Sequence, residues 1–314
     1  MNLLIVGFGK MGCRHAQSCL DANLFSNIYI YELDKYIYIQ NCKLIGAEEN
    51  QMILLDNLDS FNEKIDFAII ATTAKPRYEL TKLLIKKGVK YFLLEKVVFQ
   101  SEKQFDSIIH LLDKYSAKAY CNFVNRYNNT FNLIKKELQF SENSKFKMFI
   151  NGGNFGLSCN SLHYIDLFEY ITNIKVELKN YKISVSLNGN KRGIEYNEFH
   201  GQIIYSNTKG HTLHILDDKD KFDDHEIIFI LSNSTYLIKY KSMKLYKLTN
   251  ANFIEISNFE VIPSSILTSI IINDIINDNI ILPNVKQSRD NHCDFFEIIN
   301  NELNLSKDDI CPIT

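Results

Sequence analysis

The chain has 314 residues, of which 46% are hydrophobic and 23% charged, a composition typical of globular proteins that excludes a disordered chain. Its 35 basic and 37 acidic residues give a formal net charge of −2, so we expect no nucleic-acid partner that is held mainly by charge. The length suggests two domains. The apolar stretches are too short to span a membrane and the N-terminus does not resemble a signal peptide, so we expect a cytoplasmic protein without a membrane partner.

Residues 1–120 alternate short apolar runs with helical patterns. Strands are expected at Leu3–Gly7, Asn27–Glu32, Lys64–Thr72, Val89–Glu95 and Ala117–Phe123, and helices at Lys10–Asn23, Arg77–Gly88 and Glu102–Tyr115. This alternation predicts βαβ units and a doubly wound parallel sheet, the α/β architecture of a dinucleotide-binding domain over residues 1–120.

Residues 121–314 have a different pattern, dominated by β-rich stretches that are separated by polar turns. Strands are expected at Lys145–Gly152, Lys175–Leu187, Gly193–Ser206, Thr212–Leu216, Glu226–Leu231 and Thr235–Leu248, and helices at Ser161–Thr172, Ser264–Asn279 and Arg289–Leu303. The pattern predicts a second, α+β domain over residues 121–314 with a mainly antiparallel sheet.

A GxGxxG motif follows the first strand and opens the first helix. It consists of Gly7, Phe8, Gly9, Lys10, Met11 and Gly12. In this context the first glycine permits a tight turn, the second lets the backbone approach a pyrophosphate, and the third lets helix and strand pack closely. The helix N-terminus would supply N–H donors to the phosphates. The alternative is a glycine turn in an ordinary buried βα unit.

Glu32 ends the second strand, about 20 positions after the last glycine, where an acidic residue binds the ribose hydroxyls of a dinucleotide. A carboxylate there would repel a 2′-phosphate, so NAD is favoured over NADP. The loop formed by Ala71, Thr72 and Thr73, and Glu95 at the end of a later strand, are expected near the ribose and the nicotinamide, because ligands lie at the carboxyl ends of such strands.

Lys96 directly follows Glu95 and is a candidate catalytic residue. A partly buried ammonium at the end of a strand can contact a substrate hydroxyl and take part in proton transfer. The alternative is a surface lysine in a lysine-rich chain.

A second candidate is His163, near the start of the helix that we expect at Ser161–Thr172. The helix dipole would favour its neutral form, which can accept a hydroxyl proton while a hydride leaves the same carbon. Asp166 shares its helix face and would support the imidazole. Such a pair is often only structural.

Two other patterns do not predict a metal. His211 and His214 are three apart in a predicted strand and would face opposite sides, so no metal site is expected there. An acidic run lacks the calcium-loop pattern and is expected to be a solvated hairpin loop. It consists of Asp217, Asp218, Asp220, Asp223 and Asp224.

Taken in order, several segments resemble the glucose–fructose oxidoreductase/inositol dehydrogenase (Gfo/Idh/MocA) family. They are VGFGKMGCRHA, DFAIIATTAKPRYELTKLLIKKGVKYFLLEKVV, NFVNRY, GGNFGLSCNSLHYID and LPNVKQSRDNHCDFFEIINNEL. The resemblance implies a Rossmann domain joined to a C-terminal domain with a large open sheet. It also implies Lys96 and His163 as catalytic residues, and a substrate site that they form with Arg126, Tyr127, Cys159 and Asn160.

The chain departs from the family pattern at four positions. Val97 and Thr73 stand where the family has proline, Cys159 stands where it has aspartate, and Ser161 stands where it has glycine. Because Lys96 and His163 are retained, the family's activity remains the leading expectation: an NAD-dependent oxidoreductase acting on a sugar, a sugar phosphate or a nucleotide-linked sugar, in the synthesis of surface polysaccharides. The resemblance further implies a homodimer or homotetramer. The alternative is a non-catalytic regulator that binds NAD or a sugar on the same fold.

Overall fold

The structure is a computed structural model that describes residues 1–48, 50–140, 145–186, 190, 192–220, 225–249 and 252–314. It divides into two compact units. The first unit comprises Met1–Val124 and Ile262–Arg289, and the second comprises Asn125–Val261 and Asp290–Thr314. The sequence predicts two functional domains, residues 1–120 and residues 121–314, and this division stays a prediction. In the structure, residues 262–289 pack with the first unit.

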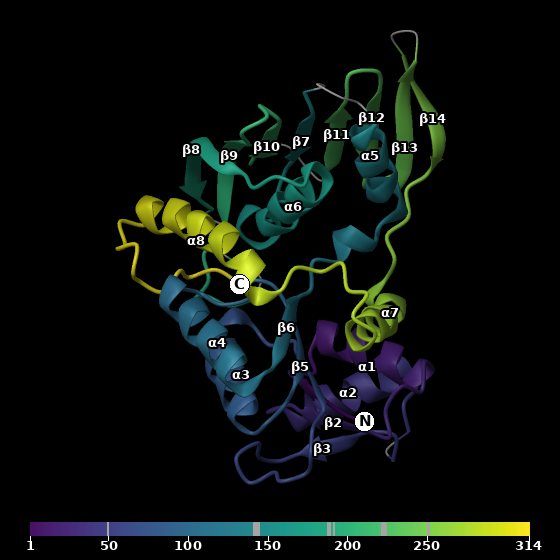
Figure 1. The fold of residues 1–314 in the computed structure, drawn as a ribbon, viewed down its shortest axis with the longest axis vertical. Coiled ribbons are helices and arrows are strands. Elements are labelled where there is room, and N and C mark those ends of the chain that lie inside the picture. The colour runs from purple at the N-terminus through teal and green to yellow at the C-terminus, as the bar shows by residue number, and fades with distance from the viewer. Residues whose placement is uncertain (49, 141–144, 187–189, 191, 221–224, 250–251) are drawn as a thin grey trace. The chain divides into compact units, whose positions relative to one another are not determined.

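The first unit contains a six-stranded sheet in which all neighbouring strands are parallel, in the order β3-β2-β1-β4-β5-β6 (Figure 1). Its strands are β1 (Asn2–Val6), β2 (Asn27–Tyr31), β3 (Ile53–Leu55), β4 (Phe67–Ile70), β5 (Tyr91–Leu94) and β6 (Lys118–Cys121). This is the strand order of a doubly wound Rossmann sheet, and it confirms the predicted parallel sheet. The central strands β1 and β4 are buried because helices cover both faces.

Five helices of the described chain pack on or beside this sheet. They are α1 (Lys10–Asp21), α2 (Lys35–Ile45), α3 (Ala74–Lys86), α4 (Glu102–Tyr115) and α7 (Ser264–Ile276). We did not predict α2, whose apolar residues have no clear helical periodicity and of which none is fully buried. Its ends are nevertheless encoded locally, since the Asp34 carboxylate accepts from Tyr36 N–H and Gly46 ends the helix in a left-handed conformation.

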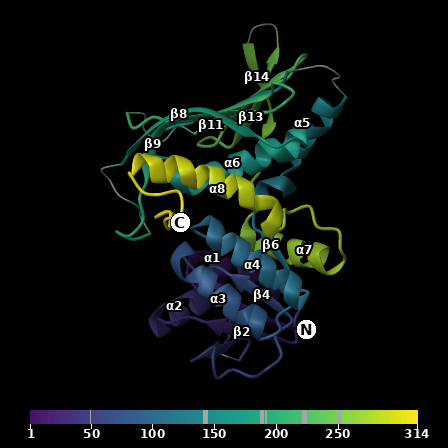
Figure 2. The ribbon, with the colours of Figure 1, turned by 60° about the vertical axis from the view of Figure 1, so that its left-hand side comes forward.

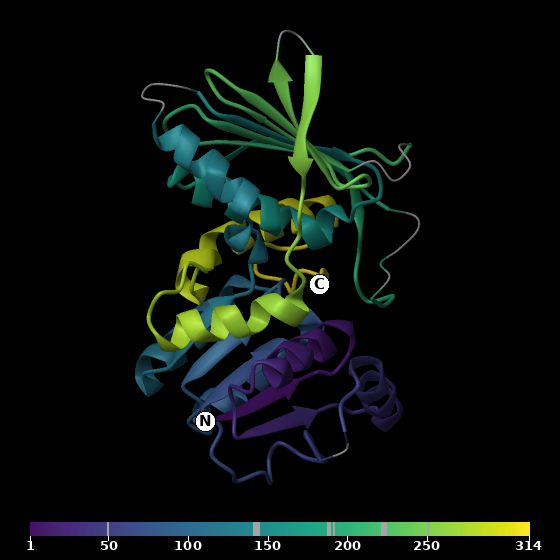
Figure 3. The same ribbon diagram turned by 90° about the vertical axis from the view of Figure 1, so that its right-hand side faces the viewer.

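Helix α7 comes from far along the chain and lies against α1 (Figure 3). The Ser18 hydroxyl on α1 donates to the Ile266 carbonyl, at 3.2 Å, and accepts from the Ser269 N–H, at 2.9 Å. These bonds fix α7 to the helix that follows the glycine motif, so the first unit is completed by residues from a distant part of the chain.

The second unit contains an eight-stranded sheet in the order β14-β13-β12-β11-β7-β10-β9-β8. Its strands are β7 (Lys147–Gly152), β8 (Glu177–Val185), β9 (Phe199–Ser206), β10 (Thr212–Asp217), β11 (Glu226–Ile230), β12 (Thr235–Lys239), β13 (Lys244–Thr249) and β14 (Asn252–Asn258). All neighbours are antiparallel except β7 and β10, which are parallel. The predicted mainly antiparallel sheet is therefore confirmed, although the stretch expected as one strand at Thr235–Leu248 is a hairpin of two.

Helices cover one face of this sheet, and no helix of the described chain covers the other (Figures 2 and 3). The second unit contains the one-turn helix η1 (Val124–Tyr127), which begins at the last residue of the first unit, together with α5 (Asn129–Gln139) and α6 (Leu157–Thr172). Phe168 on α6 stacks on Phe146, which stacks in turn on Phe229 of β11. Helix and sheet are thus joined by an aromatic core.

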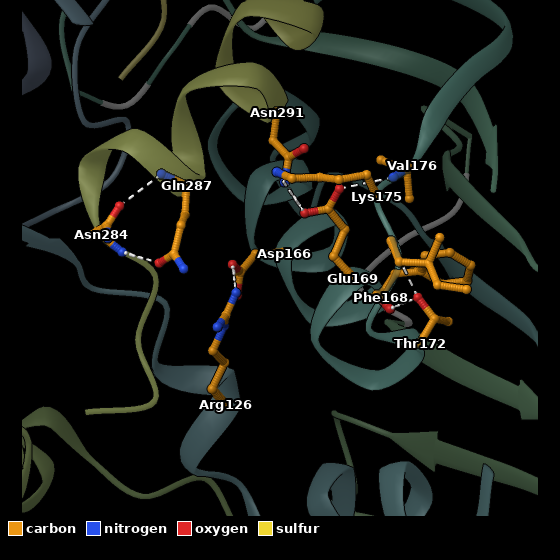
Figure 4. Close-up of polar contacts among 11 residues, drawn as sticks. Arg126, Asp166, Phe168, Glu169, Thr172, Lys175, Val176, Asn284, Gln287 and Asn291 are labelled. Carbon is orange, nitrogen blue, oxygen red and sulfur yellow. Dashed lines mark hydrogen bonds and ion pairs between the residues drawn. The ribbon is translucent and has the colours of Figure 1, made fainter. Parts of the chain in front are cut away.

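Helix α8 (Val285–Glu302) begins at a capping box. The Asn284 side chain accepts from Gln287 N–H and the Gln287 side chain accepts from Asn284 N–H, each at 2.9 Å (Figure 4). In the second unit, Asn291 donates to the Glu169 carboxylate of α6 at 2.7 Å.

Across the described ranges, no helix combines the length and the apolar character that crossing a membrane requires.

Candidate functional site

The glycine motif forms a tight turn between β1 and α1. Gly7 has a φ of +85°, and its N–H donates to the Tyr31 carbonyl at 2.8 Å. A Cβ atom on Gly12 would lie 1.9 Å from the Gly7 carbonyl oxygen, so a side chain at this position would collide with the backbone. The turn and the close packing of α1 on β1 therefore require glycine at Gly7 and Gly12.

Gly9 is different, because a Cβ atom there would meet no described atom within 4 Å. Gly9 is also the N-cap residue of α1 and has no side chain with which to cap the helix. Open space beside uncapped N–H groups at a helix N-terminus fits a phosphate group. The residues present thus fit a dinucleotide. Of the other motif residues, Phe8 is buried, and Lys10 and Met11 begin the helix.

Glu32 holds the glycine turn in place. Its Oε2 accepts from Phe8 N–H at 2.7 Å, and its Oε1 accepts from Asp34 N–H at 3.1 Å. The carboxylate therefore lies beside the glycine motif, at the end of β2. A carboxylate oxygen has more than one acceptor direction, so a ribose hydroxyl could share it.

The loop after β4 borders the same turn. A Cβ atom on Gly7 would lie 2.9 Å from the Thr72 backbone nitrogen, which shows how closely this loop approaches. Thr73 is the N-cap residue of α3, and Ala71 N–H donates to the Val6 carbonyl at 2.8 Å. Arg77 is buried and donates to the carbonyls of Thr72, Glu95 and Val97. This guanidinium thereby ties the loop after β4 to the segment after β5.

Glu95 follows β5 and is buried in a charged network. Its Oε1 accepts from Asn122 Nδ2 at 2.6 Å and lies 3.1 Å from His15 Nε2. Burial raises the pKa of Glu95, but the hydrogen bond and charge of His15, together with Asn122 and Arg77, outweigh it and lower the pKa to about 2. Glu95 is thus an ionised carboxylate that can only accept hydrogen bonds.

The partners of His15 determine where its protons are. The Thr268 hydroxyl donates its one proton to the Ser264 carbonyl at 2.7 Å, so it accepts from His15 Nδ1. The Glu95 carboxylate beside His15 Nε2 also only accepts. Both ring nitrogens of His15 thus face acceptors, and this buried His15–Glu95 pair joins α1, α7 and the end of β5.

Lys96 comes directly after Glu95 and is 7% exposed. The Lys96–Val97 peptide bond is cis. Lys96 is therefore carried by a segment that the buried ion pair and Arg77 hold, at the carboxyl end of the parallel sheet.

His163 lies on α6 in the second unit. We expected it near the start of a helix beginning at Ser161, but α6 begins at Leu157, after a left-handed Gly156. Glu198 explains the earlier start, since its Oε1 accepts from Ser158 N–H at 2.6 Å and satisfies the first turn from another element. The expected effect of the helix dipole on His163 is therefore wrong, because it fades beyond the first turn.

Asp166 does not support His163 as expected. Its two carboxylate oxygens accept from Arg126 Nε and Nη2, at 2.9 and 2.7 Å (Figure 4). Both side chains are largely buried, and Arg126 also lies over the Tyr170 ring. The bidentate pair ties η1 to α6. Arg126 was predicted to contact substrate, and that role stays a prediction, as does that of Tyr127, the half-buried last residue of η1.

Cys159 and Asn160 lie in the first turn of α6. The Cys159 thiol donates to the Thr314 carbonyl at 3.0 Å, and the Asn160 amide donates to the Phe155 carbonyl. Both residues line a cavity of about 430 Å³ in the second unit. The other lining residues are Asn154, Phe155, Gly156, Ser186, Asn190, Arg192, Glu198, His200 and Asp217. Its volume is in the range typical of small-ligand sites, ~300–1,000 Å³.

The acidic run was expected to be a solvated loop, and for Asp217 this is wrong. Asp217 is the last residue of β10 and is 1% exposed. Asp218 and Asp220 lie in the following loop, and Asp223 and Asp224 are outside the described residues.

His211 and His214 have different partners and do not form a site together. His211 Nδ1 accepts from Phe146 N–H, whereas the His214 ring lies against the Phe149 ring. In the part of the chain that the structure describes, no group of three His, Cys, Asp or Glu side chains is placed to hold a metal.

Four residues around these sites were missed by reasoning from the sequence. His15, Glu198 and His200 carry no local motif, and Asp217 was assigned to a loop. The one usable signal was the end of a β-rich stretch at Asp217, because polar side chains at strand ends often line sites. Their partners are far away in the sequence, so spacing could not reveal the contacts.

Comparisons with known proteins agree with this geometry. Residues 1–123 match the Gfo/Idh/MocA model, described as "Oxidoreductase family, NAD-binding Rossmann fold". A search of curated proteins finds no match.

Solved structures resemble nearly the whole chain. A dehydrogenase (MviM) from Clostridium difficile has a TM-score of 0.74 at 15% identity, with 96% of this chain and 99% of that one covered. UDP-N-acetylglucosamine 3-dehydrogenase from Acidithiobacillus ferrooxidans has a TM-score of 0.74 at 10% identity, with 95% and 96% covered. A super-repressor mutant of Gal80p from Saccharomyces cerevisiae has a TM-score of 0.73 at 13% identity, with 96% of each chain covered. At these identities the likeness concerns the fold.

The parallel Rossmann sheet, the glycine turn and the second, mainly antiparallel sheet define the two-part fold that these solved structures share. The match of residues 1–123 to the Gfo/Idh/MocA model confirms, for this part of the chain, the resemblance found in the sequence.

Proposed function

We propose that the protein is an NAD-dependent oxidoreductase that interconverts a hydroxyl and a keto group on a sugar, a sugar phosphate or a nucleotide-linked sugar. The observation that carries this proposal is the uncapped N-terminus of α1, with open space at Gly9 and the Glu32 carboxylate beside it. On this proposal the protein is a homodimer or homotetramer, and the sugar serves surface-polysaccharide synthesis.

Each candidate residue has a role on this proposal. Gly7, Gly9 and Gly12 shape the phosphate site, Glu32 binds the ribose, and the Ala71–Thr73 loop and Glu95 border the nicotinamide. NAD would supply the hydride acceptor when bound. The Lys96 ammonium donates a hydrogen bond to the reacting oxygen, and the His163 imidazole accepts the hydroxyl proton. Arg126, Tyr127, Cys159 and Asn160 help bind the sugar.

Glu32 is expected to make the protein prefer NAD(H) to NADP(H), because a carboxylate repels a 2′-phosphate. The variant Glu32→Gln keeps an acceptor for Phe8 N–H but removes the charge. It should reduce the preference about tenfold, the equivalent of ~1.4 kcal/mol. Calorimetric titration of both proteins with both cofactors measures this. Equal or tighter NADP(H) binding by the unaltered protein would show that Glu32 does not select the cofactor.

Lys96→Ala and His163→Ala are each expected to lower turnover by about two orders of magnitude or more, as loss of a proton-transfer group does. NAD affinity should barely change, since the glycine turn and Glu32 lie elsewhere. Cys159→Ala should matter much less, because a thiol is a weak hydrogen-bonding group. Stopped-flow NADH fluorescence with a sugar that supports turnover separates these outcomes. Normal hydride transfer in His163→Ala, together with its loss in Cys159→Ala, would contradict the assignment.

The second candidate is a regulator that binds NAD or a sugar without turning it over. The observation that favours it is the Cys159 thiol, which donates to the Thr314 carbonyl and offers no carboxylate. The similarity to a super-repressor mutant structure agrees with this candidate. If no sugar reduces bound NAD and no keto-sugar oxidises bound NADH, the regulator is the better description.

A further inference from the structure

The cavity in the second unit contains a histidine held by a buried carboxylate. His200 and Asp217 both line the cavity, and His200 Nδ1 lies 3.3 Å from Asp217 Oδ1. The Asp217 side chain is 0% exposed, whereas that of His200 is 11% exposed. A ligand in the cavity could therefore touch His200, and Asp217 would act only through it.

The end of the strand pair brings these two side chains together. Strands β10 and β7 are parallel, with Asp217 opposite Gly152, so Asp217 lies beside the loop that follows β7. On its other side, Asp217 pairs with Gly201 of β9, which has no side chain and a φ of +125°. The backbone beside His200 therefore departs from regular strand geometry, in which neighbouring side chains point to opposite faces.

The hydrogen bonds of Asp217 fix the tautomer of His200. Asp217 Oδ1 accepts from the Asn154 N–H at 2.7 Å. An oxygen that already accepts from a backbone N–H stays an acceptor toward the imidazole, so His200 Nδ1 carries the proton. In the neutral imidazole, Nε2 then has a free lone pair. Among the described residues no hydrogen bond to His200 Nε2 is formed, and the atom is not sealed from the cavity.

The charges around the cavity indicate what Nε2 would bind. Two carboxylates, Asp217 and Glu198, belong to its wall, and the cation among the lining residues is Arg192, which is exposed. Asp217 Oδ2 is buried and has no partner in the described chain, which adds to the negative potential. A phosphoryl group near His200 would be repelled, whereas a hydroxyl group would donate to Nε2 at little electrostatic cost.

We propose that His200 is a specificity-determining residue that accepts a hydrogen bond from a hydroxyl group of an unphosphorylated sugar ring, and that Asp217 is the residue that positions it. This proposal rests on the proposed function, since it names the part of the sugar that the second unit recognises. Any phosphoryl or nucleotide group of the substrate lies away from His200.

The first test needs no ligand. Nitrogen-15 NMR of the histidine rings at about pH 8, where histidine is ordinarily neutral, reports the tautomer directly. The full-length protein should show the proton of His200 on Nδ1. In Asp217→Ala, Nδ1 loses its acceptor, so the proton should shift toward Nε2, the tautomer that an unconstrained histidine favours. An Nε2–H tautomer in the unaltered protein, or an unchanged tautomer in a folded Asp217→Ala variant, would overturn the positioning role.

The second test uses two matched substitutions and two probes. A glutamine at position 200 can place its amide oxygen near the Nε2 position, whereas an asparagine reaches only the Nδ1 position. Binding of D-glucose and of D-glucose 6-phosphate is followed by saturation-transfer NMR without NAD. Glucose should bind more tightly than its phosphate. His200→Asn should weaken glucose binding about tenfold, as expected for one hydrogen bond, and His200→Gln should retain most of it.

The outcomes separate this proposal from the proposed function. Three results would overturn the role of His200. They are tighter binding of glucose 6-phosphate than of glucose, an equal loss of glucose affinity in His200→Asn and His200→Gln, and no binding of glucose at all. Each of these results would leave the NAD titration of the glycine turn and Glu32 standing. Sugar binding that depends on His200, in a protein that binds no NAD(H), would instead reject the oxidoreductase and keep the proposal for this cavity.

Discussion

Glu95→Ala is expected to destabilise the protein by about 3–5 kcal/mol, because it breaks the buried His15–Glu95 pair and leaves His15 Nε2 without its partner. His15 would then keep only its bond to Thr268, and the Asn122 amide would lose its acceptor. Urea denaturation of the full chain measures the loss. Glu95→Gln is the matched control, since it keeps the shape and one acceptor oxygen but removes the charge. If the charge matters most, Glu95→Gln should lower the free energy of unfolding by about as much as Glu95→Ala.

The ion pair also gives the protein a specific acid sensitivity. The pKa of Glu95 is about 2 in the folded chain, below its ordinary value of 4.5. The stability contributed by the ionised group is therefore complete above pH 4.5 and is lost as the pH falls toward 2. The Glu95→Gln variant lacks this component, so the stability difference between the two proteins should shrink over that interval. A difference that is constant with pH would contradict the ionised state of Glu95.

Gly12→Ala is expected to destabilise the first unit by about 3 kcal/mol and to abolish NAD binding, because its Cβ atom would lie 1.9 Å from the Gly7 carbonyl oxygen. The backbone of the glycine turn must move to admit it. Thermal unfolding followed by circular dichroism, with calorimetric titration of NAD, measures both effects. If Gly12→Ala unfolds at the same midpoint temperature as the unaltered protein, the turn tolerates a side chain.

Gly9→Ala is the matched control. Gly9 has a φ of −66°, which alanine adopts readily, and its Cβ atom would meet no described atom within 4 Å. Its unfolding midpoint should stay unchanged. NAD affinity should fall at least tenfold, because the methyl group would occupy the space that the pyrophosphate needs on the proposed function. The pair thus separates a glycine required by the fold from one required by the ligand.

The parts that could be predicted from the sequence are those encoded over short distances. The glycine motif, the strands beside it and Glu32 follow one another in a fixed order, so their local patterns were sufficient for the parallel sheet. Helix α2 was missed because its apolar residues lack periodicity, although Asp34 and Gly46 mark its ends. The hairpin of β12 and β13 was read as one strand because its turn contains neither glycine nor proline.

The parts that could not be predicted depend on contacts between distant residues. Asp166 lies one helical turn from His163, yet both its oxygens bind Arg126, which is 40 positions away. The start of α6 is set by Glu198, and the burial of Asp217 by the parallel pairing of β10 with β7. Local spacing describes which residues share a helix face, but it does not show which distant partner a charged group will find.

The return of the chain to the first unit has a consequence for how the protein folds. The chain leaves this unit after Val124 and re-enters it at Ile262, so α7 can pack on α1 only if the ends of a long loop meet. With the intervening residues unfolded, closing that loop would cost about 4 kcal/mol of chain entropy. Once the second unit has folded, the Asn128 amide donates to the Glu260 carbonyl at 2.8 Å and holds those ends together. Folding of the second unit therefore removes most of the entropy cost of completing the first, and loop closure couples the folding of the two units.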